Sequence, residues 1–176
     1  MMGRAILLLV LGAAPVLAQT AAGPPLRSNG EYARVVWREV QAYLRQSAQA
    51  APDSLFAFKP RPEVRSFGET LDHVAASERG YCQMALGEKP SGGGAGTGAK
   101  TMAEVIAALQ TASSVCERAY GQPDAELALP AYGGGRTSRL QILLTNAIHD
   151  NEHYGNVVTY LRLNRIVPPS SQPSPR

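Results

Sequence analysis

The residues with the clearest potential for chemistry are two histidines four positions apart, His149 and His153, in the stretch TNAIHDNEHYGNVVTYLRL. Residues four apart on an α-helix lie on one face, one turn above each other. Two imidazoles in that arrangement can chelate one metal ion, although histidines that face water or the core without a metal are also common. The chain has three histidines, so His73 is the imidazole that could complete the site.

The letters HDNEH also resemble two zinc-protease motifs. The H-E-x-x-H motif requires glutamate where Asp150 stands, whereas the inverted H-x-x-E-H motif is matched through Glu152. Both protease classes take another ligand from later in the chain, but no Asp, Glu, His or Cys follows His153. This inventory argues against a protease, and a third ligand must come from upstream.

The histidine pair lies in a predicted helix over residues 138–164, which has one apolar face. That face consists of Leu140, Leu143, Leu144, Ala147, Tyr154, Val158 and Leu161. The opposite side consists of Ile142, Asn146, His149, His153, Asn156 and Tyr160. A polar stripe is costly to bury unless its groups are paired or bound, although it could simply face water. Asn146, Asn156 and Tyr160 are therefore candidates to orient substrate or water beside an ion.

His73 lies in a second predicted helix, over residues 66–87. Thr70 and Ser77 share its face and are further candidates near the site. This face borders the apolar arc of the helix, and an edge position favours a site open to solvent. Glu78 falls at the centre of the apolar arc, either as a buried partner of the site or as a satisfied structural acid. The structural role is favoured, because bundles tolerate one paired acid.

Capping boxes mark the starts of three helices, each pairing a hydroxyl with an acidic or amide side chain three residues later. They begin at Ser66, Thr101 and Ser138. The predicted helices cover residues 29–49, 66–87, 101–121 and 138–164. No strand pattern competes, so the sequence predicts an all-α four-helix bundle. The glycine-rich segment SGGGAGTG connects the second and third helices.

The two ends of the chain differ from the predicted bundle. Residues 1–18 have the positive start, short apolar core and cleavage pattern of a secretory signal peptide, with an uncleaved anchor as the alternative. Export to the periplasm or the exterior is therefore predicted, with no membrane contact after cleavage. Residues 19–28 are predicted to be a flexible lead-in and residues 167–176 a disordered Pro/Ser tail. The bundle then covers residues 29–166.

Charge and cysteine content limit the partners further. The net charge is +3, and Lys and Arg are scattered, so the chain lacks the basic patch that nucleic-acid binding requires. Cys82 and Cys116 are the two cysteines. In an exported chain they could form one disulfide, or they could be two buried thiols.

The stretches FGETLDHVAASERGYC and HDNEHYGNVVTYLRLNRIVPPSS together resemble the DinB-like family of metalloenzymes. The resemblance covers roughly residues 31–171, the span of one domain. It implies that His73, His149 and His153 bind one divalent metal ion, often nickel or zinc, with open coordination positions. One departure is Asn164-Arg165, where relatives often have a glycine that ends the last helix.

The resemblance also implies a long crossover between the second and third helices, in an up-down-down-up bundle. Those two helices then run parallel, and Cys82 and Cys116 stand at nearly the same height. An antiparallel pair would separate them by roughly 20 Å along the axis, too far for a disulfide. A Cys82–Cys116 disulfide is therefore expected.

Two classes of function follow. The first is an exported metalloenzyme, a thiol transferase or a hydrolase, because a cation held by neutral imidazoles can activate a thiolate or water. Its partner would be a small thiol or hydrolysable compound, and a homodimer is left open. The alternative is a metal-binding or partner-binding bundle without turnover. Asp150 and Glu152 are expected to point away from the histidine face, so no general base is named. An enzyme should show an open coordination position facing a cleft.

Overall fold

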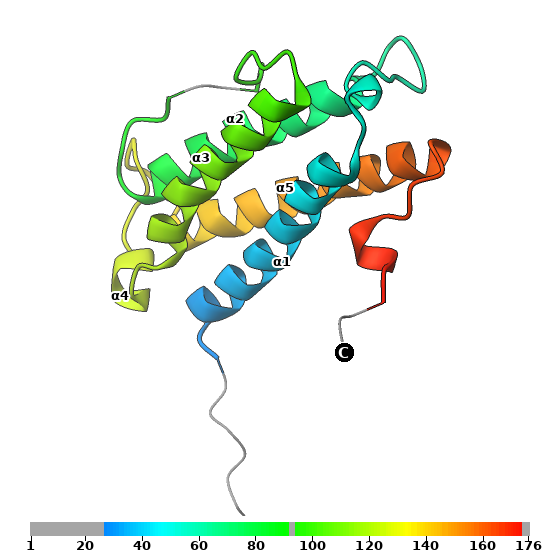
Figure 1. The fold of residues 1–176 in the computed structure, drawn as a ribbon. Coiled ribbons are helices and arrows are strands. Elements are labelled where there is room, and N and C mark those ends of the chain that lie inside the picture. Colours follow the sequence, from blue (N-terminus) through cyan, green and yellow to red (C-terminus); the bar gives the residue numbers. More distant parts are fainter. Residues whose placement is uncertain (1–26, 92–93, 174–176) are drawn as a thin grey trace, which may run out of the picture.

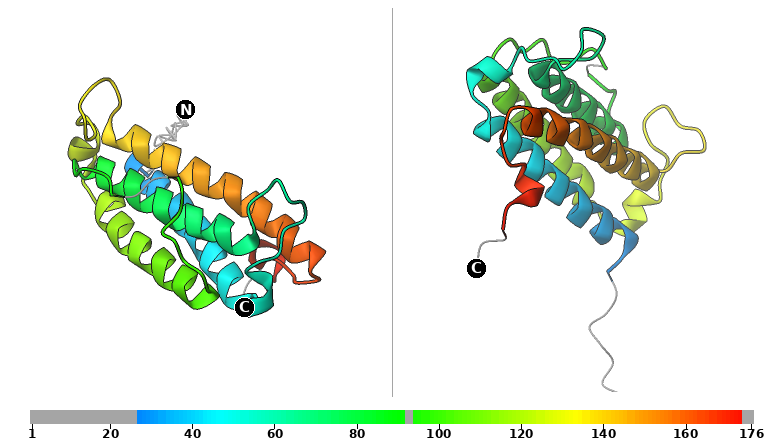
Figure 2. Two further views of the ribbon diagram at one scale, coloured as in Figure 1. Left: turned by 90° about the horizontal axis from the view of Figure 1, so that it is seen from above. Right: turned by 90° about the vertical axis from the view of Figure 1, so that its right-hand side faces the viewer.

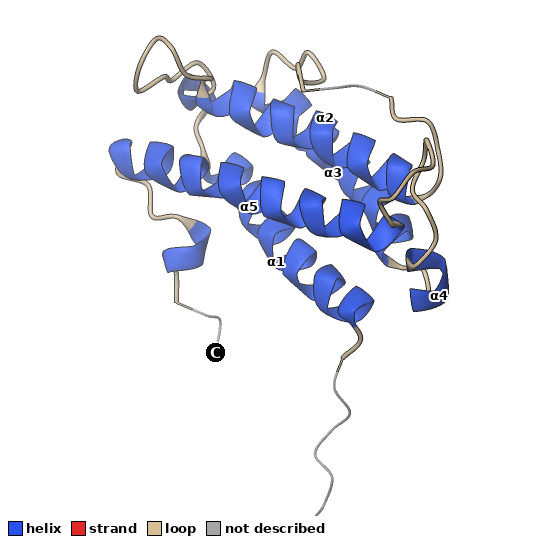
Figure 3. Cartoon of the chain, turned by 180° about the vertical axis from the view of Figure 1, so that it is seen from behind, coloured by secondary structure: helices blue, strands red, loops and turns tan. Residues whose placement is uncertain are grey.

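The computed structural model describes residues 27–91 and 94–173, and this part of the chain contains helices and no strands. Four of the helices are long, and they pack side by side, as seen in Figure 1 and from behind in Figure 3. They are α1 (Asn29–Ala50), α2 (Phe67–Ala85), α3 (Met102–Tyr120) and α5 (Arg139–Leu163). Three short elements are η1 (Asp53–Leu55), α4 (Asp124–Leu127) and η2 (Pro169–Ser171). The all-α prediction is confirmed; the proposed signal peptide lies outside the described residues.

The helix starts follow the capping signals, with one difference. Ser66 and Ser138 form complete capping boxes, and so does Ser28 at the start of α1, which was not predicted. At Thr101 only half of the box forms. The Thr101 hydroxyl accepts from Glu104 N, but the Glu104 carboxylate accepts from Lys100 N at 2.6 Å. The Thr101 backbone is more extended, with φ −135°, which presents a different N–H to the carboxylate.

Apolar side chains of the long helices form two clusters. The first joins the C-terminal halves of α1 and α5 to the N-terminal halves of α2 and α3, through Leu44, Leu161, Phe67 and Met102 among others. The second joins the opposite halves, through Trp37, Leu143, Cys82 and Cys116 among others. Between the clusters, each long helix contributes one buried polar residue, and we call this set the polar layer. Its members are Gln41, Glu78, Ser113 and Asp150.

Cys82 and Cys116 are paired as a disulfide in the last turns of α2 and α3, with their Cα atoms 5.1 Å apart. Both cysteines are fully buried. The structure therefore confirms that the two cysteines lie at disulfide distance, and it places the C-terminal ends of α2 and α3 side by side.

The glycine-rich connector between α2 and α3 returns along α2 and is fixed there by Asp72. The Asp72 carboxylate accepts from Thr97 N at 2.9 Å, from Gly98 N at 3.0 Å and from the Thr97 hydroxyl. Gly96 has φ +96°, and a Cβ atom there would collide with the same carboxylate. This clamp holds the connector along α2, as Figure 2 shows, and Gly94 of the connector contacts His73.

The C-terminal segment corrects the prediction of a disordered tail from residue 167. Pro168 and Pro169 are buried, and the Tyr154 hydroxyl bonds to both Oγ and N of Ser170. Prolines have a fixed φ and therefore lose little entropy on ordering. The Tyr154 hydroxyl pairs with the backbone N–H and the side chain of Ser170 in this turn. Residues 174–176 lie outside the described part. Before the turn, Arg165 adopts φ 60°, the left-handed conformation that glycine adopts most readily.

No helix in the described ranges is both long enough and apolar enough to span a membrane.

Candidate metal centre

Three imidazoles converge where α2 packs against α5. His73 comes from α2, and His149 and His153 come from successive turns of α5. One ring nitrogen from each residue lies within 4.8 Å of the other two. The ring centroids are 4.5–5.1 Å apart. The structure therefore brings together all three residues that the sequence analysis selected as ligands.

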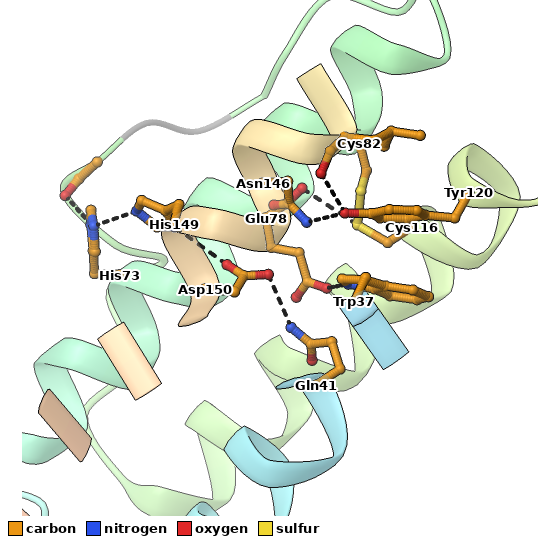
Figure 4. A network of polar contacts seen from close by, with 12 residues as sticks. Trp37, Gln41, His73, Glu78, Cys82, Cys116, Tyr120, Asn146, His149 and Asp150 are labelled. Atoms are coloured by element: carbon orange, nitrogen blue, oxygen red, sulfur yellow. Dashed lines mark hydrogen bonds and ion pairs between the residues drawn. A yellow bond between two sulfur atoms is a disulfide. The ribbon is translucent and has the colours of Figure 1, made fainter. Parts of the chain in front are cut away.

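Hydrogen bonds fix the orientation of the first ligand, His73. Its Nδ1 lies 2.7 Å from the carbonyl oxygen of Gly94 in the connector. Because a carbonyl oxygen only accepts, Nδ1 carries the hydrogen and donates it. The lone pair of this neutral imidazole is then on Nε2, which points towards His149 (Figure 4).

The second ligand, His149, is oriented in a parallel way by a carboxylate. Its Nδ1 lies 3.3 Å from Oδ1 of the fully buried Asp150. When Nδ1–H donates to this carboxylate, the lone pair is again on Nε2.

The two Nε2 atoms of His73 and His149 then face each other at 3.2 Å. Two facing lone pairs repel unless a cation lies between them. Two nitrogens bound at about 2.0–2.1 Å to a tetrahedral ion are roughly 3.3–3.4 Å apart. In the described part of the chain, Nδ1 of His153 is also buried without a hydrogen-bond partner. These donors fit a divalent metal ion.

The surroundings keep two of the ligands neutral, which is the metal-binding form. Burial, together with the neighbouring His149 and His73 when they are charged, lowers the pKa of His153 to about 4. Burial also lowers the pKa of His73, although the hydrogen bond to Gly94 acts in the opposite direction.

A cleft of about 310 Å³ opens beside the histidines. His73 and His149 line it together with Ala76, Ser77, Gly80, Tyr81, Met84, Pro90 and Gly94. The Tyr81 ring meets the His149 ring edge-on, with centroids 5.7 Å apart. A larger hollow of about 510 Å³ lies between α1 and α3, but the described residues place the group of three potential ligands at the smaller cleft.

Of the other candidates, Ser77 lines this cleft. Thr70 and Tyr160 donate their hydroxyl hydrogens to the main-chain oxygens of Ser66 and Arg65. Asn156 is exposed. These three residues therefore have structural or solvent contacts in place of a contact with the histidines.

Asn146 and Glu78 are buried in the core. Asn146 Nδ2 donates to the Tyr120 hydroxyl at 3.2 Å, and Tyr120 donates to the Leu143 carbonyl. Glu78 Oε1 accepts from Trp37 Nε1 at 2.8 Å. The expectation that Glu78 occupies the apolar arc holds, and its direct partner is Trp37 in α1.

Asp150 is the site residue that sequence reasoning missed. It was expected to point away from the histidines, and this was wrong: its side chain turns into the core and reaches back to His149 (Figure 4). A signal was present, because Asp150 shares the helical face of Leu143, Ala147 and Tyr154. A polar residue on an apolar face indicates a buried group, as at Glu78.

Burial has the same effect on both core carboxyl groups. It raises the pKa of Glu78 well above its usual range, and the nearby Asp150 adds to this effect. Burial also raises the pKa of Asp150, while the contact with His149 acts to lower it.

Comparison with known protein families gives a match that spans most of the bundle. A family model described as the DinB superfamily matches residues 37–157, a range that includes all three histidines and the polar layer. A search of curated proteins gave no match.

Proposed function

Because the chain belongs to the DinB superfamily, we propose that it is a metal-dependent enzyme whose single divalent ion, nickel or zinc, is held by His73, His149 and His153. The observation that carries this proposal is the pair of Nε2 atoms facing each other at 3.2 Å beside an open cleft. When bound, such an ion supplies a Lewis acid that can activate a thiolate or water.

The residues around the cleft define what the protein itself contributes. Gly94 and Asp150 hold the imidazoles in the orientation that leaves Nε2 free. Ser77 and Tyr81 bring hydroxyl groups to a lining that is otherwise largely apolar. We propose that they orient a small thiol or a hydrolysable compound, as a transferase or hydrolase requires.

One observation favours the alternative, a metal-binding bundle without turnover. No Asp, Glu or Lys is among the described residues that line the cleft, so a proton acceptor other than the histidines is not at hand. Turnover assays with small thiols and with model esters distinguish the two. Metal binding without turnover of either class would support the alternative.

The proposal includes export and an up-down-down-up topology with the connector as the crossover. The paired cysteines are compatible with an oxidising compartment. Two observations support the topology. In each apolar cluster, one end of α1 and α5 packs against the opposite end of α2 and α3. In addition, Thr97 of the connector contacts Asp72 near the start of α2.

The test is metal analysis of protein purified without a histidine tag, in wild type and in His153→Ala. We expect one equivalent of metal in the wild type. The metal affinity of the variant should fall by more than about 100-fold. This exceeds the loss that is typical when a residue hydrogen-bonded to a metal ligand is removed. It should stay folded by circular dichroism, because His153 is not in either apolar cluster.

The control is Asn156→Ala, an exposed change on the same helix that should retain the metal. Full occupancy in His153→Ala, or a wild type that binds no divalent metal, would overturn the proposal.

A further inference from the structure

The carboxyl group of Asp150 has no exposed surface. Each of its two oxygens contacts a different side chain. Oδ1 lies 3.3 Å from Nδ1 of His149, and Oδ2 lies 3.5 Å from Nε2 of Gln41 in α1. Within the described residues, Asp150 has no ion pair with Lys or Arg. Its contacts therefore point to His149 on one side and to the centre of the bundle on the other.

Gln41 is itself held in place by a third helix. Its Oε1 accepts from the Ser113 hydroxyl of α3 at 3.2 Å. Gln41 is 2% exposed and Ser113 is 7% exposed, so water competes little with either contact. One series of contacts thus crosses the bundle from the candidate metal centre to the hollow between α1 and α3. It runs from His149 through Asp150 and Gln41 to Ser113.

We infer that Asp150 is a positioning residue for the metal ligand His149, and that Gln41 and Ser113 hold its carboxylate in place. This inference rests on the proposed function. By accepting from Nδ1–H, the carboxylate selects the tautomer that presents Nε2 to the ion and fixes the angle of the ring. Gln41 limits rotation of the carboxylate, and Ser113 limits rotation of the Gln41 amide.

A purely structural role explains these contacts less well. A buried carboxylate without a charged partner is costly. Asp150 shares its face of α5 with the apolar Leu143, Ala147 and Tyr154, and its one buried polar neighbour there, Asn146, is neutral. His73 shows the comparison within the same site: its Nδ1 is held by the neutral Gly94 carbonyl. Asp150 gives His149 an acceptor with negative charge, which raises the basicity of the Nε2 lone pair that would bind the metal.

The test compares Asp150→Asn with Glu152→Gln. Both changes remove one negative charge beside a histidine ligand, but Glu152 is exposed. Zinc or cobalt affinity, measured by competition with a chelator, should fall about 10–100-fold in Asp150→Asn, the range for an outer partner of a ligand. Glu152→Gln should change affinity little, because an exposed charge is well screened. The visible spectrum of the cobalt form should change only in Asp150→Asn.

A second readout does not depend on metal. Nitrogen NMR of the metal-free protein should show His149 protonated at Nδ1 in the wild type, and Asp150→Ala should lose this preference because no acceptor remains. If either Asp150 variant fails to fold, Gln41→Leu leaves the carboxylate in place and should produce a smaller loss in the same direction.

The outcomes separate the two proposals. Suppose that the wild type binds metal. If the Asp150 variants then keep the Nδ1-protonated tautomer of His149 and bind metal as tightly as Glu152→Gln does, the positioning role is wrong. If the wild type binds no metal, the proposed function fails, while the tautomer still decides whether Asp150 positions His149.

Discussion

Glu78 is the residue whose environment is most at odds with its charge. Its side chain is fully buried, one carboxyl oxygen accepts from Trp37, and the other oxygen has no hydrogen-bond partner among the described residues. Burial and the nearby Asp150 raise its pKa well above the usual range. The folded protein therefore keeps a proton on Glu78 that the unfolded chain releases above about pH 4.5.

This difference predicts a pH-dependent effect of Glu78→Gln. Because the folded pKa is raised, wild-type stability should fall as pH rises from about 4.5 towards the folded pKa, and the variant should lack this contribution. The variant should be more stable than wild type at pH 8, by about 1–3 kcal/mol, the cost of an uncompensated buried polar group. Urea unfolding at pH 5 and pH 8 measures the difference. An identical pH slope in the two proteins would contradict the assignment of a raised pKa.

At the residue scale, the sequence predicted the ligands better than their partners. His73, His149 and His153 could be selected because imidazoles are few and helical spacing places two of them together. Asp150, Gln41 and Ser113 could not be assigned in the same way, because the burial of each depends on a polar group from another helix. The sequence shows which face a residue occupies, but the partner that makes burial tolerable becomes visible only when the helices are packed.

The connector between α2 and α3 is the element that completes the site. Its Gly94 carbonyl holds His73, and the Asp72 clamp holds the segment from Thr97 to Gly98. The sequence predicted its length and flexibility, but its contacts with α2 depend on tertiary structure. Helix starts were easier to predict, since a cap depends on residues three positions apart, as at Ser66 and Ser138.

Two glycines in the connector provide a matched pair of variants. Gly96 and Gly98 have φ +96° and +90°, so alanine introduces similar backbone strain at both positions. At Gly96 the new Cβ would also collide with Asp72, whereas at Gly98 it would meet no atom within 4 Å. Gly96→Ala should therefore displace the connector from α2 and weaken metal binding by about 10-fold or more, as expected for loss of an outer partner. Chelator competition on both variants checks this; equal affinities would show that the clamp does not support His73.

The disulfide ties α2 to α3 at the end where both helices finish. Its two cysteines are separated by 34 residues, and closing a loop of that size in the unfolded chain corresponds to about 3–4 kcal/mol in the chain-entropy model. Reduction should lower the free energy of unfolding by about this amount. Urea unfolding with and without a reducing agent measures it, with Cys82→Ala/Cys116→Ala as the control that reductant should not affect. A wild type that is also insensitive to reductant would argue against the disulfide.

On the scale of the whole molecule, the metal centre and the fold are linked, because the ligands come from α2 and α5. Metal that binds only the folded state should raise the free energy of unfolding by about 2.7 kcal/mol at a free concentration 100 times the dissociation constant. Thermal unfolding with and without zinc measures this stabilisation, and His153→Ala should lack it.

The same stabilisation should depend on pH in a defined direction. Protons compete with metal for the ligands, so the effect of zinc should shrink as pH falls. The lowered pKa values of His73 and of His153, the latter about 4, mean that these two ligands resist protonation below the ordinary histidine range. In the metal-free protein, the unfolded chain takes up those protons first, so stability should also fall between about pH 6.5 and pH 4. An acid-insensitive metal-free protein would contradict these shifts.

The position of the connector has a consequence for how such a protein can diversify. Pro90 and Gly94 form one wall of the cleft, while Ala76, Gly80 and Tyr81 of α2 form another. Loops tolerate changes of length and sequence far better than packed helices do. Descendants of this chain could therefore alter the shape of the cleft beside the three histidines through changes in the connector around Pro90, while the histidines and the polar layer stay unchanged. Selection on the shape of the cleft and selection on folding would then act through separate segments.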